Sequence, residues 1–310
     1  MNYSVAIFGS SLRDDFDKYS DKDLLIVADN YDLLKQLEEK YSSENWSISF
    51  YTYSKLEYLS KNGSLFLKHL KEEAKILHDD NNAIKNILSD YSIKSSYNLE
   101  VKEASDFFEI IQYIPHTNSG LAWFCDTLYV GLRNYLIFSN SEENVFEFSF
   151  NKLLIKLKNE NRISQNQLNI LKELRVIKRN YREDIIDEFP STDFVNKVIE
   201  IIEYLGLIKK IQIIKPTSFQ SLVEEKINSY QYSPYQKLRL LEGYYTSQNQ
   251  NLFEIKKIIS NPQFYAMKFK DEIYISKLIS TIKNATQQRL IANNGYSRKS
   301  LISETRKENN

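Results

Sequence analysis

The chain has 310 residues, and its 41 lysines and arginines balance 41 aspartates and glutamates, so the formal net charge is zero. This length allows two domains with separate cores. The equal numbers of basic and acidic residues exclude a surface coated with one sign of charge, but they allow local basic grooves. The single cysteine, Cys125, excludes an intrachain disulfide and a cysteine-based metal site. No apolar run approaches the roughly 20 residues that span a bilayer. We therefore expect a reduced, cytoplasmic protein without membrane insertion.

The N-terminal part of the chain alternates between strand-like and helix-like segments. In the strand-like segments β-forming residues form short apolar runs or alternate with polar ones, and in the helix-like segments leucines recur at helical spacing. We expect strands at 5–8, 24–28 and 46–53, and helices at 30–40 and 64–77. The sequence thus predicts a small α/β domain, which we assign to residues 1–92.

From about residue 95 onward the apolar residues follow a helical period, and we expect no strand there. Helices are expected around 107–114, 118–138, 150–157, 165–182 and 193–207, followed by three further helical stretches that Pro216, Pro234 and Pro262 punctuate. We assign a helical domain to residues 93–291 and a flexible tail to 292–310, which is almost wholly polar. The predicted fold class is α+β, an N-terminal α/β domain followed by an all-helical C-terminal domain.

The candidate catalytic segment lies within the first thirty residues. The first strand delivers Gly9 and Ser10 into a tight turn, where glycine lets backbone amides approach a phosphate closely. After a gap of ten residues, Asp21 and Asp23 stand two apart at the start of the next strand, so their carboxylates share one face. Paired carboxylates beside a phosphate cradle suit Mg²⁺, with Mn²⁺ as the alternative. Two such ions can activate an attacking hydroxyl and steady a pyrophosphate leaving group.

This segment resembles the Gly-Ser…Asp-x-Asp signature of nucleotidyltransferases of the DNA-polymerase-β superfamily. That superfamily includes minimal antitoxin-like members, antibiotic adenylyltransferases and signal-making enzymes of bacterial defence. The resemblance implies that Gly9 and Ser10 grip the triphosphate of a nucleoside triphosphate, and that Asp21 and Asp23 are catalytic and hold the metal. Arg13, in the intervening turn, also matches the minimal members, so the resemblance adds it to the nucleotide-binding residues.

Two further segments bear on this resemblance. Residues 64–70 resemble a helix often found later in such domains, and Ser20–Leu24 matches the minimal form of the motif. The superfamily usually supplies a third carboxylate from the next strand, but residues 47–52 contain no acid, and Ser49 stands near the expected position. Two carboxylates can still hold one metal together with waters and nucleotide oxygens. We therefore expect an active enzyme, with an inactive nucleotidyltransferase-fold binding module as the alternative.

A basic cluster in the helical part is a second candidate. Arg175, Lys178, Arg179 and Arg182 share one helical face, and Tyr181 is adjacent. Arg175, Arg179 and Arg182 are therefore candidate nucleotide-binding residues, able to grip phosphates beside a ring that stacks on a base. The alternative is a solvated face paired with neighbouring acids. The three histidines are scattered, which disfavours a histidine metal site, and we expect His69 to be a core residue rather than a base.

Tyr296 stands alone in the polar tail. The default interpretation is an incidental residue, and the alternative is a catalytic, tethered hydroxyl nucleophile. The arrangement resembles the Hailong-type antiphage nucleotidyltransferases, which have a helical C-terminal portion and a C-terminal tyrosine. Enzymes of that family make single-stranded deoxyadenylate oligomers primed by the tyrosine, and these oligomers hold a channel-like effector in check. The resemblance implies a deoxynucleoside triphosphate substrate, a single-stranded oligonucleotide product and an effector protein as partners.

We therefore expect a metal-dependent nucleotidyltransferase that makes an oligonucleotide or nucleotide signal in antiphage defence. Transfer to a small molecule or to a toxin protein is the alternative enzymatic function. The nucleobase, the sugar, the product length and a homodimeric state are left open.

Overall fold

The computed structural model describes residues 2–14, 22–42, 46–185, 189–227, 229, 231–250 and 253–260, with 276–277, 279–280 and 284. The chain divides into two compact units, residues 1–214 and 215–310. The first unit holds an α/β region and a run of helices, and the second is helical where it is described. This arrangement confirms the predicted α+β fold class, with a mostly helical C-terminal region. The boundary predicted after residue 92 lies inside the first unit.

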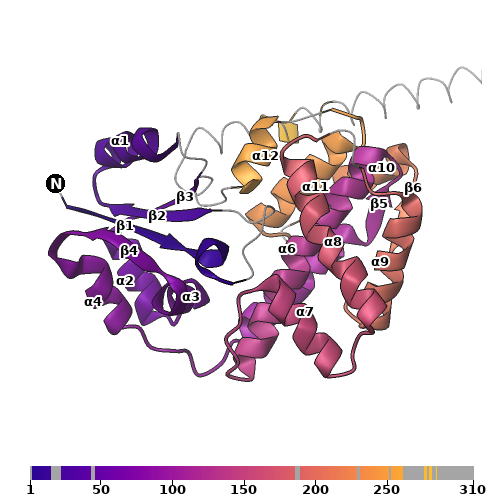
Figure 1. Ribbon diagram of the computed structural model, residues 1–310. Helices are drawn as coiled ribbons and strands as arrows, with labels where there is room; N and C mark the ends of the chain where they lie inside the picture. Colours follow the sequence, from indigo (N-terminus) through magenta and orange to yellow (C-terminus); the bar gives the residue numbers. More distant parts are fainter. Residues whose placement is uncertain are drawn as a thin grey trace, which may run out of the picture. The chain divides into compact units, whose positions relative to one another are not determined.

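The N-terminal region is built on a four-stranded sheet in the order β3–β2–β1–β4 (Figure 1). Its strands are β1 (Tyr3–Phe8), β2 (Asp23–Ala28), β3 (Ser47–Tyr51) and β4 (Lys75–Asp79). Strand β1 is antiparallel to both β2 and β4, whereas β2 and β3 are parallel. Leu24 to Val27 are fully buried, as expected of a central strand covered on both faces.

Helices cover both faces of this sheet. Figure 1 shows α1 (Tyr31–Ser42) on one face, and α2 (Tyr53–Lys61), α3 (Leu65–Glu73) and α4 (Ala83–Ser89) on the other. Leu56, Leu67 and Leu70 of this second layer pack in one core with Leu25 and Val27 of β2. Full burial of such a side chain contributes about 1.5–3 kcal/mol relative to leaving it exposed. The second layer therefore fixes α3 against the β1 and β2 strands.

One sequence prediction in this region is wrong, and another is confirmed with shorter bounds. The single helix predicted at 64–77 ends at Glu73, because Ala74 is extended and Lys75–Asp79 pairs with β1 as an edge strand. Leu77 misled the helical pattern, since it is apolar but 47% exposed on that strand. The strand predicted at 46–53 stops at Tyr51, because Thr52 caps the N-terminus of α2 by accepting a hydrogen bond from the amide of Lys55.

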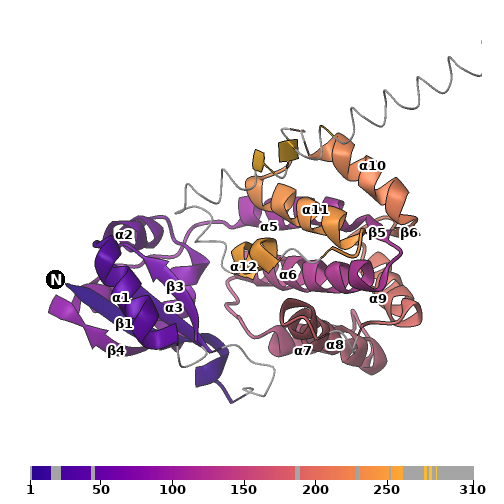
Figure 2. The same ribbon diagram turned by 90° about the horizontal axis from the view of Figure 1, so that it is seen from above.

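The second part of the first unit is a set of helices around α6 (Figure 2). These helices are α5 (Asn98–Asp106), α6 (Asn118–Glu142), α7 (Phe150–Asn159), α8 (Gln165–Arg182) and α9 (Thr192–Tyr204). Helix α6 contacts each of the other four and is buried along much of its length. The sequence predicted α6 to α9 with small shifts at their ends. Among the described residues, no helix is both long and apolar enough to cross a membrane.

Two short strands contradict the prediction of no strand after residue 95. Strands β5 (Tyr113–Pro115) and β6 (Gln212–Ile214) pair in parallel, with Ile114 opposite Ile213. Three residues are too few to show a strand period in sequence, so the pairing is visible only in the fold. Ile114, expected on a helical face, therefore lies in a strand.

The described part of the second unit contains α10 (Pro216–Lys226), α11 (Pro234–Thr246) and α12 (Phe253–Ser260). Helices α10 and α11 begin with a proline. Proline has no backbone N–H, and an N–H in the first turn of a helix would have no partner within the helix. Gln220 donates a hydrogen bond to Ser247 Oγ at 3.0 Å, which joins α10 to the end of α11. The predicted tail at 292–310 lies outside the described residues.

Candidate functional site

The turn after β1 is the first element of the site. Residues Gly9–Leu12 form a short 3₁₀ helix, and Gly9 has a φ of +75°, the left-handed region that favours glycine. Phe8 is in register with Asp23, so β2 begins beside this turn. A Cβ atom added to Gly9 would lie 2.7 Å from Asp23 Oδ2. The structure thus brings Gly9 and Asp23 together, and a side chain at position 9 would displace the Asp23 carboxylate.

Asp21, the other predicted metal ligand, lies outside the described residues. Ser10 follows Gly9 in the turn, and its carbonyl accepts a hydrogen bond from the amide of Arg13 at 3.1 Å. No group of three metal-binding side chains is found in the part of the chain that the structure describes. A carboxylate held against a glycine turn nevertheless offers the hard oxygen donor that Mg²⁺ prefers. Asp23 can therefore supply one oxygen ligand to Mg²⁺, and a magnesium site at this turn stays a prediction.

Strand β3 defines the position from which a third acid would act. Parallel pairing places Ser47 opposite Asp23, and Ser49 opposite Leu25. Partners in register share a face of the sheet, so Ser47 is the direct neighbour of Asp23, and Ser49 lies two residues further along. Neither position carries an acid.

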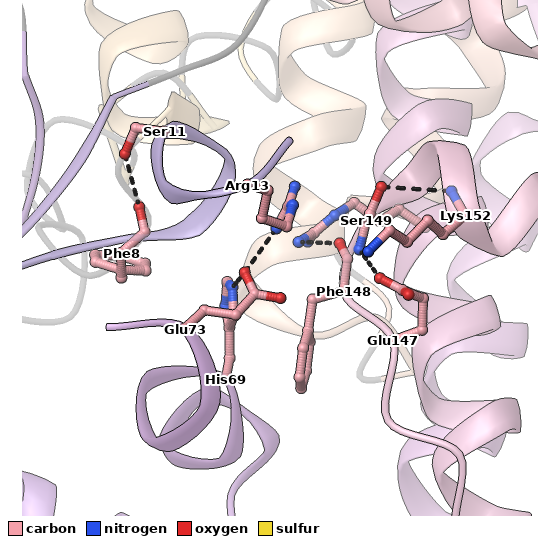
Figure 3. Close-up of polar contacts among 10 residues, drawn as sticks. Phe8, Ser11, Arg13, His69, Glu73, Glu147, Phe148, Ser149 and Lys152 are labelled. Atoms are coloured by element: carbon pink, nitrogen blue, oxygen red, sulfur yellow. Dashed lines mark hydrogen bonds and ion pairs between the residues drawn. The ribbon is translucent and has the colours of Figure 1, made fainter. Parts of the chain in front are cut away.

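Arg13 ends the turn and forms an ion pair that was not predicted. Its Nη1 atom lies 2.9 Å from Glu73 Oε2, and the side chains of Arg13 and Glu73 are 14% and 19% exposed. The same oxygen lies 3.0 Å from His69 Nε2. Figure 3 shows Arg13 and His69 both directed at the carboxylate of Glu73. Helix α3 therefore contributes an acid–histidine pair that contacts the end of the turn.

The electrostatics of this pair follow from burial and hydrogen bonding. Burial lowers the pKa of His69, against an opposing hydrogen bond to Glu73, and Arg133 and Arg13 lower it further. Burial raises the pKa of Glu73, but the hydrogen bonds and charges of His69 and Arg13 outweigh it, so the pKa lies below its ordinary value. His69 is thus a buried residue, as predicted, and Glu73 is a charged carboxylate that contacts both His69 and Arg13. The spacing of four residues between them was the sequence signal that could have revealed the pair.

Residues from the helical part of the unit complete the surroundings of His69. Its ring stacks on Phe148, with centroids 4.5 Å apart and planes at 20°, and the Phe8 ring meets it edge-on at 5.8 Å. The carbonyl of Phe148 accepts a hydrogen bond from Arg133 Nη2 of α6 at 3.2 Å. His69 is therefore wedged between β1 and the segment before α7.

The basic cluster of α8 makes contacts within the helical part. Arg182 Nε lies 2.7 Å from Oδ1 of the fully buried Asp126, and Arg179 Nε lies 2.9 Å from Glu183 Oε1. Lys178 lies over the ring of Tyr129. The Arg179–Glu183 pair fits the alternative of a solvated face paired with neighbouring acids, whereas Arg182 pairs with a buried acid 56 residues away. A role of Arg175, Arg179 and Arg182 in nucleotide binding stays a prediction. Tyr296 lies outside the described residues.

The comparisons with known proteins agree with the N-terminal geometry. Residues 2–77 match the family model of the nucleotidyltransferase domain. A search of the curated proteins and a search of the solved structures each returned no match. The matched range contains Gly9, Ser10, Arg13, Asp21 and Asp23. The N-terminal region therefore has a nucleotidyltransferase domain, which indicates a nucleotidyl transfer activity.

Proposed function

We propose that the chain is a metal-dependent nucleotidyltransferase that acts on a nucleoside triphosphate. An acceptor hydroxyl attacks the α-phosphorus, an oxygen–phosphorus bond forms, and the bond to the β-phosphate oxygen breaks. Pyrophosphate leaves with the bonding electrons, and the hydroxyl proton passes to solvent. The observation that carries this proposal is the contact between the Gly9 turn and the Asp23 carboxylate.

In this proposal the residues of the turn bind the triphosphate. The backbone at Gly9 allows close approach, Ser10 offers a hydroxyl, and Arg13 offers a guanidinium, which forms strong charge-assisted hydrogen bonds to phosphate. Asp21 and Asp23 would hold Mg²⁺ or Mn²⁺. When bound, such an ion neutralises phosphate charge and lowers the pKa of an attacking hydroxyl. The five residues orient the α-phosphate for attack.

We propose that the acceptor is the hydroxyl of Tyr296, which would start a single-stranded oligonucleotide that acts as a signal in antiphage defence. A phenol with a pKa of about 10 is mostly protonated at neutral pH, but its tether would give it a high effective concentration at the site. Transfer to a small molecule or a toxin protein uses the same metal and turn residues with a different acceptor.

A binding module without activity is the second candidate, and one observation favours it. Neither Ser47 nor Ser49 on β3 supplies the third acid that related enzymes use. Such a module would bind nucleotide or a partner protein and release no pyrophosphate. Release of pyrophosphate thus separates the two candidates.

The experiment is incubation of the purified protein with each α-labelled ribo- and deoxyribonucleoside triphosphate and Mg²⁺, followed by gel separation. A ladder indicates a polymerase, and a labelled protein band that Tyr296→Phe removes indicates self-priming. A single shifted small molecule indicates transfer to an added acceptor. Absence of every labelled product and of pyrophosphate would contradict the proposed activity and favour the binding module.

A further inference from the structure

We propose that Glu73 is a positioning residue, which holds the guanidinium of Arg13 in the orientation that binds the triphosphate. The inference rests on the proposed function, because Arg13 is assigned to the triphosphate there. Nothing in the Gly-Ser…Asp-x-Asp pattern points to Glu73, which lies 60 residues after Arg13 in sequence.

The first step is the placement of Arg13. It follows the Gly9–Leu12 turn directly, and its side chain is only 14% exposed, which is low for an arginine. An arginine side chain has many rotamers, so its guanidinium adopts one orientation only if a partner fixes it. A guanidinium also carries five N–H donors in a planar fork, more than one carboxylate oxygen can accept. The contact with Glu73 fixes one side of that fork.

The second step is that Glu73 is itself held in place. It is the last residue of α3, and its Oε2 atom accepts from His69 as well as from Arg13. His69 cannot turn away easily, because the ring of Phe148 stacks on it and the ring of Phe8 meets its edge. Phe8 is the residue in register with Asp23. The contacts thus connect Arg13, through Glu73 and His69, with Phe8 of β1, the strand that ends at the Gly9 turn.

The alternative is that the ion pair of Arg13 and Glu73 only fastens α3 to the turn. A largely buried ion pair is a weak device for that purpose, since the desolvation of two charges offsets much of their attraction and apolar residues would do as well. The charge of the guanidinium is required when Arg13 must also bind an anion. A fixed guanidinium at the end of a phosphate-binding turn meets that requirement.

The test is the dissociation constant for the triphosphate that the wild type binds best, measured by calorimetry with Mg²⁺ on the full chain. Glu73→Gln keeps the size of the side chain but removes the charged acceptor, and we expect weaker binding by about tenfold, equivalent to about 1.4 kcal/mol. The matched control is Glu72→Gln. Glu72 is adjacent on α3, is 38% exposed and pairs with Lys68, so its loss removes the same charge at nearly the same place. We expect no change in affinity for the control.

A double-mutant cycle shows whether Glu73 acts through Arg13. Arg13→Gln should weaken triphosphate binding, and adding Glu73→Gln to it should have no further effect. The affinity for the matching nucleoside, which lacks phosphates, should be the same in all variants. Melting temperatures establish that each variant is folded, and Glu73→Asp, which keeps the charge, should recover part of the affinity.

The outcomes separate this inference from the proposed function. Equal affinities of Glu73→Gln and Glu72→Gln, tighter binding by Glu73→Gln, or additive losses in the cycle would overturn the positioning role while the wild type still binds and turns over nucleotide. A wild type that binds no triphosphate would overturn both.

Discussion

The carboxylate of Asp23 lies beside Gly9, so close that a methyl group at position 9 would displace it. A Cβ atom on Gly9 would come within 2.7 Å of Asp23 Oδ2, and the φ of +75° adds a backbone preference for glycine. The β1–β2 register produces this contact, because it pairs Phe8 with Asp23. The β1–β2 register therefore fixes the proposed phosphate-binding turn against the strand that carries Asp23, the proposed metal ligand.

The first prediction tests this contact with two glycines. Gly206 has a similar φ of +69°, but nothing lies within 4 Å of an added Cβ. Gly206→Ala should lower the free energy of unfolding by about 1–2 kcal/mol, the cost of a left-handed backbone for an L-residue. Gly9→Ala should lower it further and also displace Asp23, so only this variant should lose triphosphate affinity. Denaturant unfolding and calorimetry measure both effects. Equal losses of stability and intact binding in both variants would refute the contact.

The second prediction concerns the third acid. Since Ser47 is in register with Asp23, Ser47→Asp should place another carboxylate beside it. In the presence of a chelator the like charges repel, so the melting temperature should fall; Mg²⁺ should restore it, and Mg²⁺ affinity should exceed that of the wild type. Ser49→Asp, two residues further along, is the comparison and should gain less. If Ser49→Asp gains more, the carboxylate site is centred further along β2 than the register implies.

The third prediction separates structure from binding in the basic cluster. Asp126 is fully buried and accepts from Arg182, whereas Arg179 and Glu183 form a more exposed pair. Arg182→Ala should lower the free energy of unfolding by about 3 kcal/mol, and Arg179→Ala by no more than about 1 kcal/mol. Urea unfolding measures this difference. A mainly nucleotide-binding role for Arg182 predicts the opposite pattern, with stability retained and KM for the triphosphate raised.

The fourth prediction is a loss of stability on acidification. Burial holds the pKa of His69 below its ordinary value of 6.5, and the pKa of Glu73 lies below 4.5 because His69 and Arg13 outweigh its burial. In both cases the unfolded chain takes up the proton more readily, so stability is complete above the unfolded pKa and is lost as the pH falls towards the folded one. The melting temperature should decline below pH 6.5 and again below pH 4.5. His69→Gln should remove the first decline, and an unchanged profile in that variant would assign the decline to other groups.

The elements around Gly9 and Asp23 could be predicted from the sequence because local chemistry determines them. Strand β1, the Gly9 turn and strand β2, which begins at Asp23, follow from composition and spacing over a short segment. The helices α6 to α9 follow from apolar residues that recur at helical spacing over a long stretch. Glu73 was missed because its contact with Arg13 spans 60 residues. The strand β4 was missed because its pairing with β1 is also long-range, and its exposed Leu77 imitates a helical position. Neither contact leaves a periodic signal in the sequence.

The most direct test of metal-dependent transfer compares the wild type with Asp23→Asn in the same reaction. The substitution preserves the shape of the side chain beside Gly9 and removes the charge that a metal requires. We expect α-labelled product and pyrophosphate from the wild type with Mg²⁺. We expect a loss of at least about 100-fold in Asp23→Asn, since each 1.36 kcal/mol of barrier is tenfold in rate and a metal supplies several kcal/mol. Transfer at equal rates by both proteins, or no transfer by the wild type with any nucleoside triphosphate, would contradict metal-dependent transfer at Asp23.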